Sequence, residues 1–258
     1  YNIIIYVIYN CWEEKGIMGL ELSERKRNII FVNVLIGCIV STMLSTALTT
    51  ILSSVMDSFN IDAAMGQWLT SSYSLVMGIM MPLTAYLINT ISTKKLYIVS
   101  IGLFIVGLIF CIFATKFEIM LLGRLIQACG AGILTAMTQV IALTIFPAEK
   151  RGTAMGWYGL SVGVAPVIAP TLAGIISDSV GWRMFFVLVL IIAIISFIVS
   201  VFVFENVLET KNQKLDIASF IYSICGFGGI TLMVGSISGG NWKSMNFIIL
   251  SSIGILGM

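Results

Sequence analysis

The ionisable residues divide the chain into long uncharged intervals that are rich in apolar side chains. Seven intervals without Asp, Glu, Lys or Arg reach the length of about 20 residues that a helix needs to cross a bilayer. They are 28–56, 63–93, 96–115, 125–148, 152–177, 184–204 and 217–242. An eighth begins at Ser244 and is still apolar at Met258. Because the two-residue alternation of barrel strands is absent, the pattern predicts membrane-spanning helices.

Composition supports the same fold class. The chain of 258 residues is 59% hydrophobic and 10% charged, whereas soluble domains have about 25% charged residues. We therefore predict an all-α, polytopic membrane helix bundle and exclude an ordinary soluble domain.

The spans also suggest a division of the chain. We expect a cytoplasmic amino-terminal segment at 1–27, a six-span bundle at 28–204, a cytoplasmic connector at 205–216, and spans seven and eight at 217–258. Span eight is too short to cross a bilayer, so we expect a fragment of a longer protein. Residues 1–17 lack the features of a signal peptide, and we expect the native start at Met18.

Successive connectors lie on alternate sides of the membrane, and the basic residues are distributed unequally between the two sides. One side has ten of them: Lys15, Arg25, Lys26, Arg27, Lys94, Lys95, Lys150, Arg151, Lys211 and Lys214. The other has three: Lys116, Arg183 and Lys243. Under the positive-inside rule this predicts a cytoplasmic amino terminus. Trp68, Trp182 and Trp242 then lie at outward span ends, where we expect each indole N–H to reach water.

Several chemistries are excluded by residue type. The chain has no histidine, which rules out histidine-based nucleophiles and histidine metal ligands. Its five cysteines have no Cys-x-x-Cys spacing and are interpreted as packing residues. A net charge of +2 argues against nucleic-acid binding. We predict no enzyme activity, no metal and no cofactor.

The first span has two contrasting faces. Its hydroxyl side chains form one arc: Ser41, Thr42, Ser45, Thr46, Thr49, Thr50 and Ser53. Its apolar side chains form the opposite arc: Leu44, Ala47, Leu48, Ile51 and Val55. We expect the apolar arc to face lipid and the hydroxyl arc to face protein or water. The hydroxyls would either permit close helix packing or line a cavity.

The fourth span contains an arginine inside its predicted outer end. A charged side chain at that depth is costly, so Arg124 is expected to point into the bundle and find carboxylate, carbonyl or water partners. Gln127 and Ala131 share its face, and Gly130 with Gly132 allows another backbone to approach. The alternative is an arginine that extends to the outer interface.

The fifth span carries small residues and prolines at alternating spacings of three and four. They are Gly152, Gly156, Gly159, Gly163, Pro166, Pro170, Ala173 and Gly174. This stripe predicts a backbone-to-backbone contact along the whole helix, with the prolines bending it. The contact would serve either gating or packing alone.

Three segments together indicate a family. Residues 121–132 (Leu-Leu-Gly-Arg-Leu-Ile-Gln-Ala-Cys-Gly-Ala-Gly) resemble motif B of the major facilitator superfamily, and residues 164–174 resemble its antiporter motif C. Residues 85–95 resemble motif A, although Asn89 and Thr90 replace its usual acidic residue and arginine. The resemblance is to the fourteen-span drug/proton antiporters of EmrB and QacA type, and within them to lincomycin-type multidrug exporters.

The resemblance implies a major facilitator fold, of which this chain would be the amino-terminal half and the start of the central span pair. It implies coupling or gating roles for Arg124, Gln127, Gly130, Pro166, Pro170, Gly174, Lys94 and Lys95. Substrate would contact Ser45, Thr49, Tyr73 and Met77. Many relatives have an aspartate at the position of Ser45, and here no carboxylate lies deep in a span. The proton carrier would lie in the second half of the protein or among Asp57, Asp62 and Asp178.

The expected protein is a bacterial plasma membrane exporter that moves small-molecule drugs outward by alternating access, in exchange for protons. Its energy source is the proton gradient, its surroundings are the lipid bilayer, and it works as a monomer. A uniporter or solute importer of the same fold is an alternative, since neither needs a proton carrier. A non-transporting membrane assembly subunit is an alternative of another class.

Overall fold

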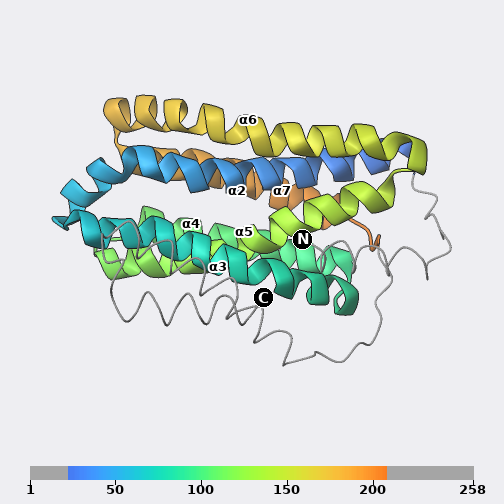
Figure 1. Ribbon diagram of the computed structural model, residues 1–258, viewed down its shortest axis with the longest axis horizontal. Coiled ribbons are helices and arrows are strands. Elements are labelled where there is room, and N and C mark those ends of the chain that lie inside the picture. Colours follow the sequence, from blue (N-terminus) through green and yellow to red (C-terminus); the bar gives the residue numbers. More distant parts are fainter. Residues whose placement is uncertain (1–22, 208–258) are drawn as a thin grey trace, which may run out of the picture.

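The computed structural model describes residues 23–207, which form six α-helices joined by short turns (Figure 1). The helices are α2 (Glu24–Phe59), α3 (Ala63–Thr90), α4 (Thr93–Ile112), α5 (Phe117–Ile145), α6 (Ala148–Val180) and α7 (Trp182–Val203). Each is long and apolar enough to cross a membrane, which confirms the first six predicted spans and the all-α class. The predicted spans seven and eight, residues 1–22 and most of the connector lie outside the described residues.

Capping residues set where several of the helices begin and end. Ser23 caps α2 by accepting from the Lys26 amide, and Asp62 caps α3 by accepting from the Met65 amide at 2.8 Å. Asn60 ends α2 in the left-handed conformation, with φ of 52°. Short polar side chains tolerate that region better than others do. Gly181, with φ of 92°, connects α6 to α7 in one residue.

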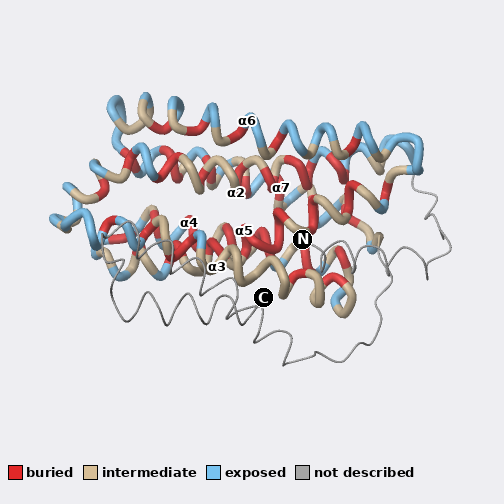
Figure 2. The backbone as a smooth tube through the Cα atoms, viewed as in Figure 1, coloured by how far each residue is buried: buried red, intermediate tan, exposed pale blue. Residues whose placement is uncertain are grey.

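Two helices form the centre of the bundle. Helix α2 packs against α6, α7 and α5, and helix α5 packs against α4, α3 and α2. In Figure 1, α6 lies along one side of the bundle next to α2, and α3 lies along the opposite side next to α5. Figure 2 shows buried residues along the middle of the bundle and a largely exposed outer edge on α6.

Helices α4 and α5 touch backbone to backbone at glycines. A Cβ added to Gly107 of α4 would lie 2.6 Å from both the Gln127 amide nitrogen and the Gly123 carbonyl oxygen of α5. Gly130 of α5 meets the backbone of Ser100 and Phe104 in the same way. Small residues allow this approach in membrane helices, where dispersion and not water exclusion drives association.

The apolar arc of the first span does not face lipid, so that prediction was wrong. Leu44, Ala47, Leu48, Ile51 and Val55 are all 0–1% exposed and belong to the core. They are buried because α6, α7 and α5 surround that side of α2. The hydroxyl arc lies on the opposite side, where Thr49, Thr50 and Ser53 are exposed.

The glycine stripe of the fifth span is also placed differently from the prediction. Nothing in the part of the chain that the structure describes comes within 4 Å of a Cβ at Gly152, Gly156, Gly159 or Gly163. The buried side of α6 is instead formed mainly by small residues outside the stripe, namely Ala154, Ser161, Ala165 and Ala169. Ala173 is the one residue of the stripe that is buried with them. Gly174 alone among the stripe's glycines approaches α2, with Thr50 at 3.8 Å.

The tryptophans divide into two kinds. Trp68 is half exposed, as expected at an interface, whereas Trp182 is 4% exposed. The expectation of a water-facing Trp182 was therefore wrong. Its indole N–H donates to Ser58 Oγ at 2.9 Å, and its ring packs on Phe186. Trp242 lies outside the described residues.

Two glycines of α4 give a matched test of the α4–α5 contact. We expect Gly107→Ala to lower the free energy of unfolding by about 1–3 kcal/mol, because the methyl group must push the α5 backbone away. Gly102→Ala on the same helix meets nothing within 4 Å among the described residues. It should raise stability by about 0.5–1 kcal/mol through helix propensity. Unfolding of the full-length protein in detergent measures both; equal effects would contradict the contact.

A candidate substrate groove and a buried arginine

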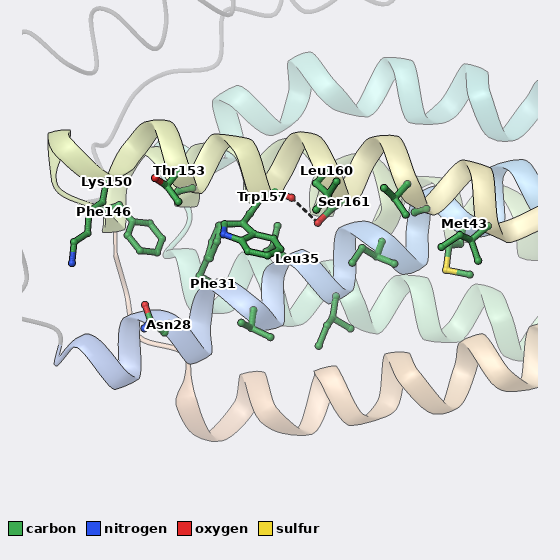
Figure 3. A pocket seen from close by; sticks show the side chains of 17 residues that line it. Asn28, Phe31, Leu35, Met43, Phe146, Lys150, Thr153, Trp157, Leu160 and Ser161 are labelled. Atoms are coloured by element: carbon green, nitrogen blue, oxygen red, sulfur yellow. Dashed lines mark hydrogen bonds between the residues drawn. The ribbon is translucent and has the colours of Figure 1, made fainter.

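A groove of about 890 Å³ lies between α2 and α6 (Figure 3). Helix α2 contributes side chains spaced three and four residues apart: Asn28, Phe31, Val32, Leu35, Ile36, Ile39 and Met43. The other wall is formed by Phe146, which directly follows α5, and by residues of α6. The α6 residues are Lys150, Thr153, Ala154, Trp157, Leu160, Ser161, Val164, Ala165 and Ile168. The volume falls in the range of about 300–1,000 Å³ that is usual for small-molecule pockets.

The groove is apolar along its length and polar at one end. Figure 3 shows Lys150, Thr153 and Asn28 at one end and Met43 at the other. The hydroxyl of Ser161 does not add a free donor, because it donates to the Trp157 carbonyl at 2.9 Å. Such a surface suits an elongated amphipathic molecule whose polar group lies near Lys150.

The groove is open because α6 contacts α2 through small residues, while its larger side chains lie to one side of that contact. Ala154 and Ala165 bring the α6 backbone close to α2, and the larger side chains stand on the flank of this contact. Trp157 and Leu160 are 55% and 52% exposed. In the sequence, the groove residues of α2 and those of α6 each recur at helical spacing, which indicates one face of each helix. No pattern in the sequence indicates that these two helices are neighbours, so the groove was not predicted.

The hydroxyl arc of α2 lies partly open. Thr49 is exposed and donates to the Thr46 carbonyl at 2.6 Å. Thr42 and Thr46 donate one turn back in the same way, and Ser45 is half-buried. These hydroxyls satisfy the helix itself, but their oxygens still give the exposed face of α2 a polar character.

Arg124 is buried in the interior of the bundle. It is 0% exposed, so the alternative of an arginine extending to the interface is wrong. Its Nε donates to the Leu69 carbonyl at 3.3 Å, and its Nη1 donates to Gln127 Oε1 at 2.7 Å. The guanidinium lies 4.0 Å from the ring centre of Tyr73. The predicted carbonyl partner and the shared face with Gln127 are therefore confirmed.

Other predicted site residues lie near this cluster but make structural contacts. Tyr73 is 1% exposed, and its hydroxyl donates to the Ser41 carbonyl at 3.2 Å. The backbone of Met77 lies against Gly132, where an added Cβ would be 3.0 Å from the Met77 carbonyl oxygen. Their roles toward substrate stay predictions.

The residues predicted for gating are spread over several places. Pro166 and Pro170 are half-buried within the continuous helix α6. The ammonium groups of Lys94 and Lys95 form no ion pair with a residue of the segment 23–207. The Lys94 amide donates to Asn206 Oδ1 at 3.3 Å. The structure does not bring these positions into one cluster.

Four contacts between distant parts of the chain, none of them predicted, join the helices at one end and in the middle of the bundle. Lys26 pairs with Glu205, and Glu24 accepts from Lys150 at 3.3 Å. Deeper in the bundle, the Tyr97 hydroxyl lies 3.1 Å from the Asn33 carbonyl oxygen. Ser196 Oγ donates to Asn33 Oδ1 at 2.9 Å. The partners are far apart in sequence, so no local spacing could have revealed them.

Comparison with known proteins identifies the family to which this chain belongs. A family model described as Major Facilitator Superfamily matches residues 34–218. The chain is 37% identical over 93% of its length to the uncharacterized MFS-type transporter YcnB of Bacillus subtilis, covering 51% of that protein. It is 35% identical over 79% of its length to the lincomycin resistance protein LmrB of the same species, covering 43% of it.

A more distant relative is the multidrug export protein EmrB of Haemophilus influenzae, 28% identical over 74% of this chain and 38% of that protein. A crystal structure of a mutant of the peptide transporter POT in complex with sulfate has a TM-score of 0.65 at 13% identity, covering 88% of this chain and 50% of that one. The latter likeness concerns the fold alone. The chain spans about half the length of the curated relatives that it matches.

The family match covers five of the six described helices in full and most of the first. The relatives include proteins named for drug resistance and drug export. The chain is thus a multi-pass membrane protein that belongs to the Major Facilitator Superfamily.

Proposed function

We propose that the full-length protein is a secondary transporter that exports amphipathic drugs by alternating access in exchange for protons. The observation that carries this proposal is the apolar groove between α2 and α6, which is polar at one end. It offers binding by contact area and few directional bonds, which suits substrates of varied structure. The names of the relatives LmrB and EmrB support drug efflux.

Substrate would enter along the groove and reach the hydroxyl arc of α2 at Ser45 and Thr49. Thr49 is exposed and Ser45 half-buried in this conformation. Tyr73 and Met77 would be reached only in another state of the transport cycle, because Tyr73 is buried here. Movement at Gly130, Pro166, Pro170 and Gly174 would link the two states.

Coupling is assigned to Arg124 and Gln127, as the motif B resemblance implies. The carboxylates within residues 23–207 are all exposed or half-buried: Glu24, Asp57, Asp62, Glu118, Glu149, Asp178 and Glu205. The proton carrier is therefore either an outer-end residue, namely Asp57, Asp62 or Asp178, or a group beyond the described residues.

We further propose a bacterial plasma membrane location with the amino terminus in the cytoplasm. The Glu24–Lys150 and Lys26–Glu205 pairs lie at the end of the bundle assigned to the cytoplasm. Lys94 and Lys95 would act at the same end as the basic part of the inward gate. The working unit would be a monomer that uses no cofactor.

Loss of Arg124 is the first test. We expect Arg124→Ala in the full-length protein to abolish drug export while membrane insertion persists, because the variant lacks the positive charge that would favour the ionised form of a nearby acidic group. Arg124→Lys keeps the charge but not the planar donor geometry, and should also lose most export. Arg25→Ala, at an exposed position, is the control. Drug resistance that survives Arg124→Ala would reject the coupling role.

The groove has its own matched pair of variants. Val164 lines the groove, whereas Val167 on the next turn of α6 is 73% exposed and outside it. We expect Val164→Trp to fill the groove and raise the substrate KM roughly tenfold, equivalent to about 1.4 kcal/mol. Val167→Trp should leave KM unchanged. Equal KM values for both variants in drug uptake by inverted vesicles would argue against the groove as a substrate site.

The second candidate function, a uniporter or solute importer, is favoured by one observation, namely that none of the described carboxylates is buried. An uncoupler distinguishes the two. For the antiporter we expect drug accumulation in cells to rise to the level of a transporter-free strain when the proton gradient collapses. Export that continues at an unchanged rate in the presence of the uncoupler would remove antiport and leave the uniporter.

A further inference from the structure

Arg124 is a buried cation whose hydrogen-bonding partners are neutral. Its Nε and Nη1 contact a carbonyl oxygen and an amide oxygen, and its face contacts the Tyr73 ring. None of the ion pairs formed by residues 23–207 includes it. It lies seven residues after the start of α5 at Phe117, roughly 10 Å along the helix.

Three buried polar groups, on Arg124 itself, on Gln127 and on the facing helix α3, lack hydrogen-bond partners within the described segment. They are Arg124 Nη2, Gln127 Nε2 and Ser72 Oγ, and their residues are 0%, 0% and 6% exposed. Ser72 lies one turn after Leu69 on α3, the helix whose carbonyl receives Arg124 Nε. The three groups thus come from two helices in direct contact.

The orientation of Gln127 makes this cluster rich in donors. Its Oε1 accepts from Arg124 Nη1, so turning the amide over would bring two donors together. The Nε2 group must therefore be the free end. Of the three unpartnered groups, the two nitrogens only donate and the serine hydroxyl can donate, so one acceptor with negative charge would match all of them.

Nearby acceptors within the bundle are already engaged or face away. The Tyr73 hydroxyl donates to the Ser41 carbonyl, and the aromatic face of the residue covers the guanidinium. The Cys111 thiol lies 3.8 Å from the Met120 carbonyl. Asp62 is exposed and caps the start of α3. Glu118, in the first turn of α5, is exposed, and no carboxylate of residues 23–207 forms an ion pair with Arg124 in this structure.

An unpaired cation in a low-dielectric interior is unfavourable, and each unpartnered buried donor adds to the penalty. Such residues in membrane proteins are paired or mark ion pathways. The cluster has one formal positive charge and is closed to solvent, so the matching ligand is small and carries a single negative charge.

We propose that Arg124, Gln127 and Ser72 bind a small monovalent anion, a halide or the carboxylate of a small organic acid, between α3 and α5. The anion neutralises Arg124 in the conformation described here. It accepts from the guanidinium Nη2 and the Gln127 amide, with the Ser72 hydroxyl as the third donor. This inference stands on the cluster itself and does not depend on which substrate is exported.

The test is the thermal stability of the purified full-length protein in detergent at constant ionic strength. We expect Tm to rise by a few degrees, saturably, when gluconate is replaced by chloride or by formate, because a ligand of the folded state stabilises it. A rise with chloride and bromide alone identifies a halide site, and a rise with formate and acetate alone identifies a carboxylate site. The same Tm in all salts, or a linear rise that includes gluconate, would overturn the proposal.

Two variants place the effect at this cluster. Gln127→Glu supplies a built-in carboxylate and should remove the anion dependence while raising Tm in gluconate. Its control is Gln67→Glu, at an exposed position of α3, which should keep the full dependence.

If Gln127→Glu is poorly expressed, Ser72→Ala provides the second test and should shift the midpoint of the anion titration to higher concentration. An unshifted midpoint in Ser72→Ala, or undiminished anion dependence in Gln127→Glu, would reject the site. Because the measurement is stability, its result is separate from that of the export assays.

Discussion

A bilayer offers no hydrogen-bond partner to a polar group, and this constraint determines most of what the six helices do with their few polar side chains. Several hydroxyls of α2, among them those of Thr42 and Thr46, donate to carbonyls of their own helix. Tyr97, Asn33 and Ser196 are hydrogen-bonded across α4, α2 and α7. Arg124 finds a carbonyl oxygen, an amide oxygen and an aromatic face. Each arrangement replaces water by protein, and the contacts of Tyr97, Ser196 and Arg124 also fix neighbouring helices relative to one another.

The same constraint explains how much the sequence could predict. Charge spacing identified the spans, because a charged residue within hydrocarbon is costly whatever the neighbours are. The burial of Arg124 followed from the same argument. By contrast, the burial of Leu44 and of Trp182 depends on which helices surround them. An apolar side chain is equally compatible with lipid and with a protein core, so composition alone cannot assign it.

Small residues show the same limit. On α6 both the glycine stripe and the alanine set have helical spacing, and the structure uses the alanines against α2. Spacing therefore located candidate contact faces but did not rank them. The Lys26–Glu205 pair and the groove between α2 and α6 depend on contacts between distant parts of the chain. Neither leaves a local signal.

The glycine contacts between α4 and α5 bear on how the bundle can deform. At Gly107 and Gly130 the main chains of α4 and α5 approach closely, because neither glycine has a side chain to hold them apart. Because this contact depends on few side-chain rotamers, we expect α4 and α5 to move together. The α2–α6 pair is joined by alanine methyls and bordered by an open groove. We therefore expect this bundle to deform beside the groove and not around Arg124.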